Sequence, residues 1–279
     1  MIARAVGPQG LDRLASADGL GLKDNGVRDK GFTSEQAEVI TLMRVAAGVL
    51  FQCFPESFLL FGGAALLLFH QSVRHSGDLD LLARADERPA AEAIQAALAE
   101  GLSSAAKALN FGVLQFEDAS TGDLDMKLWI KASGGRRLFR VDMNRFGSVL
   151  ESEIVEYAVA VDDDHIASVK SASRDFLLLQ KAECFLLRRI VKTRDAFDVR
   201  LLKDSGAVLD QNLKSGLTDT LMSWEVDSED IVKRIEQVDA RRCTAELQQV
   251  LPQAVFETLA REGFKPLRDV LYEMYADWL

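Results

Sequence analysis

Two aspartates, Asp78 and Asp80, lie two residues apart in a segment, residues 78–82, that alternates between acidic and apolar side chains. This period of two predicts a strand whose two carboxylates point to one face. Carboxylates that close repel each other, which raises one pKa unless a cation lies between them. A hard divalent ion such as Mg²⁺ or Mn²⁺ suits this pair of oxygen donors. Taken alone, the same spacing is also typical of a solvated strand.

A third acid and a pair of glycines extend this set. Asp142 lies within an apolar strand candidate, where a carboxylate is costly to bury without a partner. A third metal-facing acid would explain it, and so would an edge position facing water or an ion pair with Arg140 or Arg145. Gly62-Gly63 separates a predicted strand from a predicted helix, where backbone N–H groups can approach a phosphate. A plain turn is the alternative for the glycines.

Charged residues recur at helical spacing further along the chain: Lys181, Arg188, Lys192 and Asp195. One continuous helix would place them on one face, and Asp198 follows three residues later. If a new helix begins near Thr193, the alignment holds only within each piece. A charged face of this kind is usually solvated.

The charge balance of the whole chain is acidic, yet its basic residues are grouped. Among 279 residues, 33 are basic and 43 acidic, which gives a net charge of −10 and argues against a general nucleic-acid coat. Residues 127–145, however, hold six basic residues against one acid, and residues 170–203 hold nine against four. If the two windows share a surface, they could flank the acidic centre and receive a polyanion.

The elements that position these residues follow from hydrophobic periodicity. Thr33 and Gln36 fit a capping box at the start of a helix that ends near residue 54. Strands are predicted at 58–61, 78–82, 111–117, 124–131 and 137–143, with helices at 64–70 and 89–98 and a hairpin turn at 133–135. From about residue 168 helical patterns continue to the end of the chain. We therefore expect an α+β fold with a boundary near 165, dividing the chain into domains 1–165 and 166–279.

Cysteines and apolar runs bear on the compartment. The three cysteines are far apart and match no disulfide or zinc framework, which favours a reducing compartment. The longest apolar run, residues 58–69, is shorter than the ~20 residues that a membrane span needs. We therefore expect a cytoplasmic protein without a membrane partner.

In order along residues 59–202, five short blocks of this sequence resemble the AbiEii/AbiGii toxin family of nucleotidyltransferases, within the DNA polymerase β-like superfamily. The first two are Phe61-Gly62-Gly63-Ala64-Ala65-Leu66 and Arg74-His75-Ser76-Gly77-Asp78-Leu79-Asp80-Leu81. The others are the strand acid Asp142, the helix from Lys181 to Arg188, and Arg194-Asp195-Ala196-Phe197-Asp198.

This resemblance implies a polymerase-β-like core, a mixed sheet with flanking helices, joined to a mainly helical C-terminal domain. It also implies metal-dependent transfer of a nucleoside monophosphate from an NTP, such as ATP, GTP or CTP, to an acceptor. Family members act as toxins of toxin–antitoxin or phage-defence systems, and some modify tRNA 3′ ends. RNA, and tRNA in particular, thus becomes the leading acceptor, although the net charge argues against a general nucleic-acid coat, and a cognate antitoxin becomes a candidate partner.

The resemblance also implies roles for individual residues. Asp78 and Asp80 would hold the metals, and Asp142 would complete the site and help to activate the attacking hydroxyl. The implied nucleotide-binding residues are Gly62, Gly63, Arg74, Ser76, Lys181, Arg188, Asp195 and Asp198. Of these, Lys181 would contact phosphate, and Asp195 or Asp198 would fix either the lysine helix or the nucleotide.

One position departs from the family pattern. Ala64 stands where the family often has Ser or Thr, so a hydroxyl donor to the triphosphate is missing and altered NTP binding is expected. Two alternatives stay open: nucleotidyl transfer to a protein or small molecule, and a catalytically silent module that binds nucleotide or a partner. A D-x-D glycosyltransferase would leave the glycine turn and the Lys181 helix unexplained.

Overall fold

The fold is built on a mixed seven-stranded sheet. The computed structural model describes residues 30–83, 89–120, 126–145, 151–162 and 164–279. The strands are β1 (Phe58–Phe61), β2 (Asp78–Ala83), β3 (Gln115–Asp118), β4 (Met126–Lys131), β5 (Arg137–Arg145), β6 (Ile154–Ala160) and β7 (Ile166–Ala172). Their order is β3-β4-β5-β2-β1-β7-β6. The pairs β2–β5 and β1–β7 are parallel, and the other neighbours are antiparallel.

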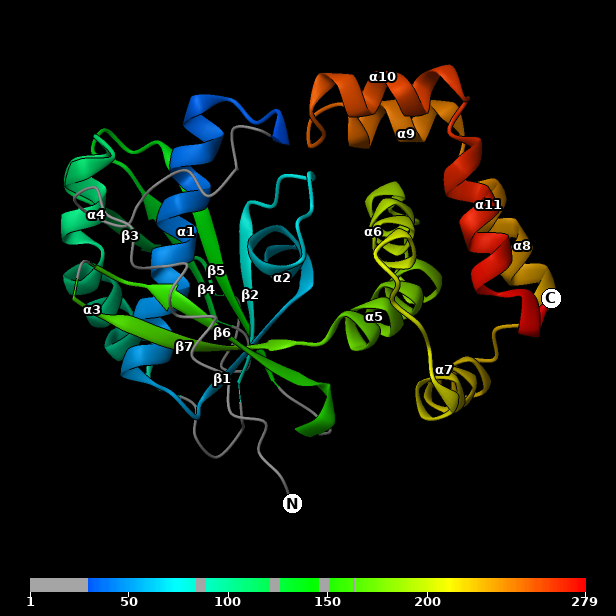
Figure 1. The fold of residues 1–279 in the computed structure, drawn as a ribbon, viewed down its shortest axis with the longest axis horizontal. Helices are drawn as coiled ribbons and strands as arrows, with labels where there is room; N and C mark the ends of the chain where they lie inside the picture. Colours follow the sequence, from blue (N-terminus) through cyan, green and yellow to red (C-terminus); the bar gives the residue numbers. More distant parts are fainter. Residues whose placement is uncertain (1–29, 84–88, 121–125, 146–150, 163) are drawn as a thin grey trace.

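Helices flank this sheet and continue beyond it. Those interspersed with the strands are α1 (Ser34–Cys53), α2 (Gly62–Phe69), α3 (Ala91–Gly101) and α4 (Ser103–Ala108). The later ones are α5 (Arg174–Leu187), α6 (Thr193–Asp204), α7 (Gln211–Ser223), α8 (Ser228–Glu236), α9 (Ala240–Leu247), α10 (Gln253–Arg261) and α11 (Lys265–Met274). In Figure 1, α1, α3 and α4 lie on one side of the molecule and α5 to α11 on the other.

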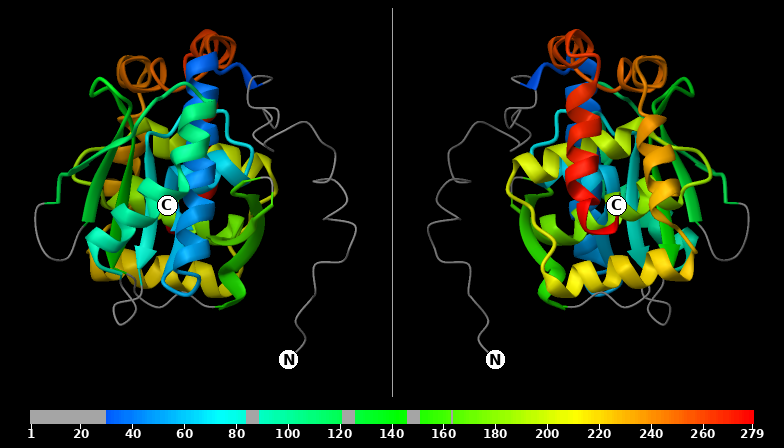
Figure 2. Two further views of the ribbon diagram at one scale, coloured as in Figure 1. Left: turned by 90° about the vertical axis from the view of Figure 1, so that its left-hand side faces the viewer. Right: turned by 90° about the vertical axis from the view of Figure 1, so that its right-hand side faces the viewer.

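The side views show the same layering. Figure 2 shows α1, α3 and α4 on the near side in one view and α11 in front in the opposite view. The helix α1 packs on β7, β6 and β5, while α2 packs on β1 and β2. The capping box at the start of α1 is confirmed: Gln36 N–H donates to Thr33 Oγ1, and Thr33 N–H donates to Gln36 Oε1.

The strand–turn–helix–strand unit β1–α2–β2 and the hairpin β4–β5 lie where they were predicted. The predicted strand at 111–117 is shorter and later, at β3, and the predicted segment 124–131 is described from residue 126 onward, as β4. The segment 181–198 is not one helix, since α5 ends at Leu187 and α6 begins at Thr193.

The hairpin β6–β7 was not predicted. A turn at Asp162, close to the predicted boundary near residue 165, connects its strands: Asp162 Oδ1 accepts from the N–H groups of Asp164 and His165. β7 pairs with β1 in the centre of the sheet, so the sheet continues past residue 165 to Ala172. The change from strands to helices follows at Ser173, the N-cap of α5. The division into two domains stays a prediction.

No helix in the described part of the chain combines the length and the apolar character needed to cross a membrane.

Candidate active site

The side chains of β2 alternate between the core and an open face of the sheet. Leu79 and Leu81 are fully buried, and the two aspartates between and beside them point to the other face. The neighbouring parallel strand β5 is in register, with Asp142 opposite Asp80 and Arg140 opposite Asp78. This pairing brings the three acids that were selected from the sequence to one face of adjacent strands.

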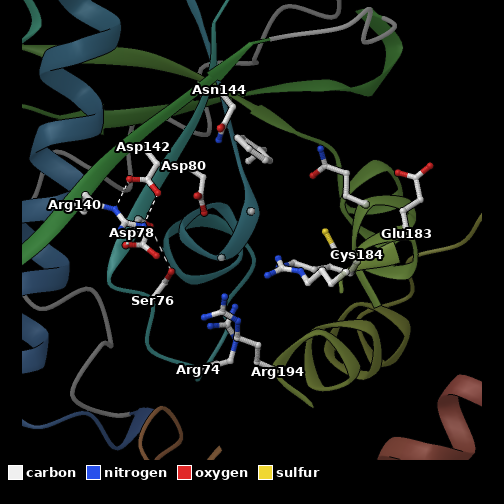
Figure 3. Close-up of a pocket in the computed structure, with 16 residues that line it drawn as sticks. Arg74, Ser76, Asp78, Asp80, Arg140, Asp142, Asn144, Glu183, Cys184 and Arg194 are labelled. Atoms are coloured by element: carbon white, nitrogen blue, oxygen red, sulfur yellow. Dashed lines mark hydrogen bonds and ion pairs between the residues drawn. The ribbon is translucent and has the colours of Figure 1, made fainter. Parts of the chain in front are cut away.

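That face forms one wall of a cavity of about 450 Å³, with the C-terminal half of α5 and the first turn of α6 opposite (Figure 3). Its volume is within the usual range for small-molecule sites, ~300–1,000 Å³. The residues that line it are Phe61, Gly62, Gly63, Arg74, Ser76, Asp78, Asp80, Arg140, Asp142, Asn144, Gln180, Lys181, Glu183, Cys184, Arg188 and Arg194.

Arg140 connects two of the acids. Its Nε and Nη2 atoms both bond to the carboxylate of Asp142, with Nη2 at 2.6 Å from Oδ2. The same Nη2 lies 3.2 Å from Oδ1 of Asp78. The ion pair with Arg140 that the sequence left open for Asp142 is therefore present, and it exists together with a position on the cavity wall.

The acids of β2 lie in an environment that disfavours their charge. Burial, together with the neighbouring charge of Asp78, raises the pKa of Asp80 to about 6. Burial also raises the pKa of Asp78, although Arg140 and Arg194 oppose this effect. A cavity with carboxylates of this kind attracts a further cation.

The glycine turn at the start of α2 touches Asp80. Gly62 has φ +70°, and a Cβ added there would overlap Oδ2 of Asp80. The N–H of Gly63 donates to the Asp80 carboxylate. A Cβ at Gly63 would come within 2.7 Å of the Ser76 hydroxyl and 2.9 Å of Nη2 of Arg74. Both glycines are thus required by the close approach of β2 and the loop before it.

Behind the cavity wall, two aspartates of α6 hold three cations. Asp198 accepts two hydrogen bonds from Arg74, at 2.7 and 2.8 Å, and pairs with Nζ of Lys181 at 2.8 Å. Asp195 pairs with Nε of Arg188 at 3.0 Å and lies 3.6 Å from Nζ of Lys181. Both aspartates have no exposed surface. Although burial opposes it, the charges of Arg74 and Lys181 keep the pKa of Asp198 below its usual value.

The sequence-selected residues therefore separate into two groups. Gly62, Gly63, Arg74, Ser76, Asp78, Asp80, Asp142, Lys181 and Arg188 line the cavity. Asp195 and Asp198 do not line the cavity and form ion pairs with Lys181. Whether they fix the lysine helix or the nucleotide stays a prediction. Ala64, the alanine that stands where the family often has Ser or Thr, is fully buried and is not among the residues that line the cavity, and its effect on NTP binding stays a prediction.

Sequence reasoning did not assign several residues of the wall. Arg194 was part of a matching block without a role, and it makes no ion pair within the described part of the chain. Asn144 follows Asp142 by two residues and so shares its face, while Gln180 directly precedes Lys181. Asn144 could have been selected from the sequence, because residues two apart on a strand share a face. Nothing in the sequence pointed to Gln180.

The two basic windows meet only in part. Arg140 from the first and Lys181, Arg188 and Arg194 from the second line the same cavity. Elsewhere in the first window, Lys131 and Arg137 pair with Glu117, and Arg136 pairs with Glu35. Much of the charge counted from the sequence is thus neutralised by acids outside the windows.

The donor types suit a divalent ion, because carboxylate oxygens with a raised pKa gain from a hard cation. The arrangement is incomplete, since no cluster of three or more His, Cys, Asp or Glu side chains within the described residues is arranged to hold a metal. Arg140 accounts for the incomplete arrangement, because its guanidinium forms ion pairs with Asp78 and Asp142, two of the three acids.

Solved structures of other proteins share features of this fold. The fold resembles those of two Helicobacter pylori structures, JHP933 and a putative nucleotidyltransferase, with TM-scores of 0.53 for both. They share 15% and 16% sequence identity with this chain, and the matches cover 88% of it and 95% and 98% of theirs. A third structure, the nucleotidyltransferase toxin MenT4 from Mycobacterium tuberculosis, gives a TM-score of 0.48 at 17% identity, over 87% of this chain and 88% of that one.

No curated protein sequence matched. A family model described as the nucleotidyl transferase AbiEii toxin of type IV toxin–antitoxin systems, however, matches residues 49–272. The match contains all the residues of the cavity wall, and the seven-stranded sheet with a helical C-terminal region agrees with the predicted nucleotidyltransferase fold. The chain therefore belongs to the AbiEii nucleotidyl transferase toxin family.

Proposed function

We propose that this toxin transfers a nucleoside monophosphate from an NTP to a hydroxyl group of RNA, with tRNA as the leading acceptor, in the cytoplasm and under the control of a cognate antitoxin. The observation that carries the proposal is a cavity that three aspartates of β2 and β5 line together with the cations of α5 and α6. In this reaction the acceptor oxygen forms a bond to the α-phosphorus of the NTP. The bond from that phosphorus to the bridging oxygen breaks, and pyrophosphate leaves.

Individual residues have separate tasks in this proposal. Asp78 and Asp80 would hold Mg²⁺ or Mn²⁺, which supplies charge neutralisation at the phosphoryl oxygens. Asp142 would take the proton of the attacking hydroxyl. Lys181 and Arg194 would bind the triphosphate, because both line the cavity and Arg194 has no acidic partner among the described residues.

An aromatic surface beside the acids supports an RNA acceptor over a small molecule. The Trp129 ring lies 4.6 Å from the guanidinium of Arg137 and 5.1 Å from that of Arg140. Trp129 is paired with Arg140 across the sheet, so this surface adjoins the acids directly. Unpaired RNA bases stack on aromatic rings and on guanidinium planes.

The test is incubation of the protein with α-phosphate-labelled NTPs, Mg²⁺ and total tRNA. We expect label on RNA with the wild type, and a loss of about 100-fold or more with Asp80→Asn, the size typical for removing a charge-stabilising group. The matched control is Asp219→Asn, an exposed aspartate of α7, which keeps the activity.

Two outcomes would select the alternatives. Label on a protein band or a small molecule, with none on RNA, would reject the RNA acceptor and keep the transfer chemistry. Calorimetric NTP binding without transfer to any acceptor would reject the enzyme and favour a binding module.

A further inference from the structure

Three residues that line the cavity, Phe61, Asn144 and Gln180, have no role in the proposed phosphate chemistry. We call these three residues the amide end. Phe61 pairs with Asp80 across β1 and β2, and Asn144 follows Asp142 by two residues, so both side chains lie on the face that carries the acids. Figure 3 shows Asn144 on one side of Asp80, with Arg74 and Arg194 on the other.

The amide groups at this end lack partners. Oε1 of Gln180 is buried and has no hydrogen-bond partner in the described part of the protein. The side-chain amide of Asn144 likewise makes no hydrogen bond to a described residue. Buried polar atoms are nearly always satisfied in folded proteins, so an unsatisfied amide that lines a cavity points to a ligand that completes it.

Phe61, the third residue of the amide end, supplies an apolar aromatic surface. The Phe61 ring is half-buried and lines the cavity immediately before the Gly62–Gly63 turn. An aromatic ring beside two carboxamides provides a flat apolar contact together with hydrogen-bond donors and acceptors at its edge. Nucleobases present the complementary combination, a π-face and a hydrogen-bonding edge.

We infer that the amide end binds the base of the NTP, with Phe61 against the base and with Asn144 and Gln180 bonded to its edge. This assignment rests on the proposed function and deepens it, because it makes these three residues the determinants of nucleotide choice. The triphosphate then extends past Asp80 toward Arg74 and Arg194, at the cationic end of the same cavity.

The test separates the two ends by equilibrium binding, without any transfer. Calorimetry with Mg²⁺ present measures the affinity of each of the four NTPs and of inorganic tripolyphosphate, which has no base. We expect the wild type to prefer one NTP by about tenfold or more, which corresponds to one or two base-edge hydrogen bonds.

Gln180→Leu and Asn144→Leu should each reduce this preference by about tenfold and leave the affinity for tripolyphosphate unchanged. Gln180→Glu, which exchanges a donor for an acceptor, should change the order of preference among the four NTPs. The control is Gln249→Leu, an exposed glutamine that does not line the cavity, which keeps the wild-type preference. Thermal unfolding verifies folding, and Gln180→Leu should be no less stable than the wild type because its amide oxygen is unsatisfied.

The outcomes distinguish this assignment from the proposed function. Equal affinities for all four NTPs in the wild type, or a preference that survives both leucine variants, would overturn the assignment even if label transfer to RNA occurs. A preference that both variants abolish would support it even if no transfer occurs, in which case the proposed reaction alone fails.

Discussion

At the scale of single residues, Arg140 decides how the acids of the cavity are neutralised. Its guanidinium holds both oxygens of Asp142, reaches Asp78, and lies against the Trp129 ring. A divalent ion bound by the same carboxylates must compete with this positive charge. Arg140 is therefore a built-in counter-ion whose displacement accompanies metal binding.

The Arg140→Gln variant should bind Mn²⁺ about tenfold more tightly or better, because a unit charge at ~4 Å is removed from the acids. Titration of the free Mn²⁺ signal by electron paramagnetic resonance measures this affinity directly. Arg136→Gln, which breaks a surface pair with Glu35, is the matched control and keeps the wild-type affinity. Weaker Mn²⁺ binding by Arg140→Gln would show instead that the arginine supports the metal site.

At the scale of elements, one buried ion pair connects the loop before β2 to α6. Arg74 lies 124 residues from Asp198 in sequence, yet the two share a pair of aligned hydrogen bonds away from water. The pair therefore fixes the position of β2, which carries Asp78 and Asp80, relative to α6. Its contribution to stability differs from that of the exposed pairs, because either partner alone would be a buried, uncompensated charge.

We expect Asp198→Ala to lower the free energy of unfolding by about 3–5 kcal/mol, which is typical of breaking a buried pair. Urea denaturation measures the change. Glu229→Ala, which removes an exposed helical pair with Lys233, should change the free energy of unfolding far less, because water screens this pair. The double variant Arg74→Met/Asp198→Leu should lose less than Asp198→Ala, since Lys181 keeps Asp195. A loss below about 1 kcal/mol in Asp198→Ala would contradict the buried-pair account.

At the scale of the whole molecule, two buried groups give opposite pH dependences of stability. Burial lowers the pKa of His70 to about 4, so its protonation favours the unfolded chain and stability is lost as pH falls from 6.5 toward 4. Asp80, with its pKa raised to about 6, behaves in reverse: its ionisation disfavours the folded state, and stability is lost as pH rises from 4 through 6. Each effect amounts to about 3 kcal/mol, and together they nearly cancel.

Single variants should uncover these opposing slopes in metal-free buffer. Relative to the wild type, the unfolding free energy of Asp80→Asn should rise by about 3 kcal/mol between pH 4 and pH 7. The unfolding free energy of His70→Phe should exceed that of the wild type at pH 4, and this difference should disappear by pH 7. Urea denaturation with EDTA at several pH values gives both differences. Parallel curves for the three proteins would refute the assigned pKa shifts.

Features of the fold that depend on residues close together in the sequence could be predicted, whereas features that depend on distant residues could not. The unit β1–α2–β2 and the hairpin β4–β5 follow from glycine turns and alternation within a few residues. The hairpin β6–β7 was missed because β6 is largely exposed and both strands mix polar with apolar residues. The contacts of Arg140 and the position of Gln180 depend on strand register and on how α5 packs, and neither is encoded in a short motif.

The Gly62 turn also constrains how this sequence can change over time. Every replacement of a glycine adds a Cβ, and at position 62 that atom collides with the Asp80 carboxylate in a backbone conformation that other residues rarely adopt. Gly77, on the same loop as Ser76, meets nothing within 4 Å and is free to vary. Among descendants that keep the toxin active, position 62 should remain glycine while position 77 drifts, and a lineage that loses Gly62 should be one that has lost its toxicity.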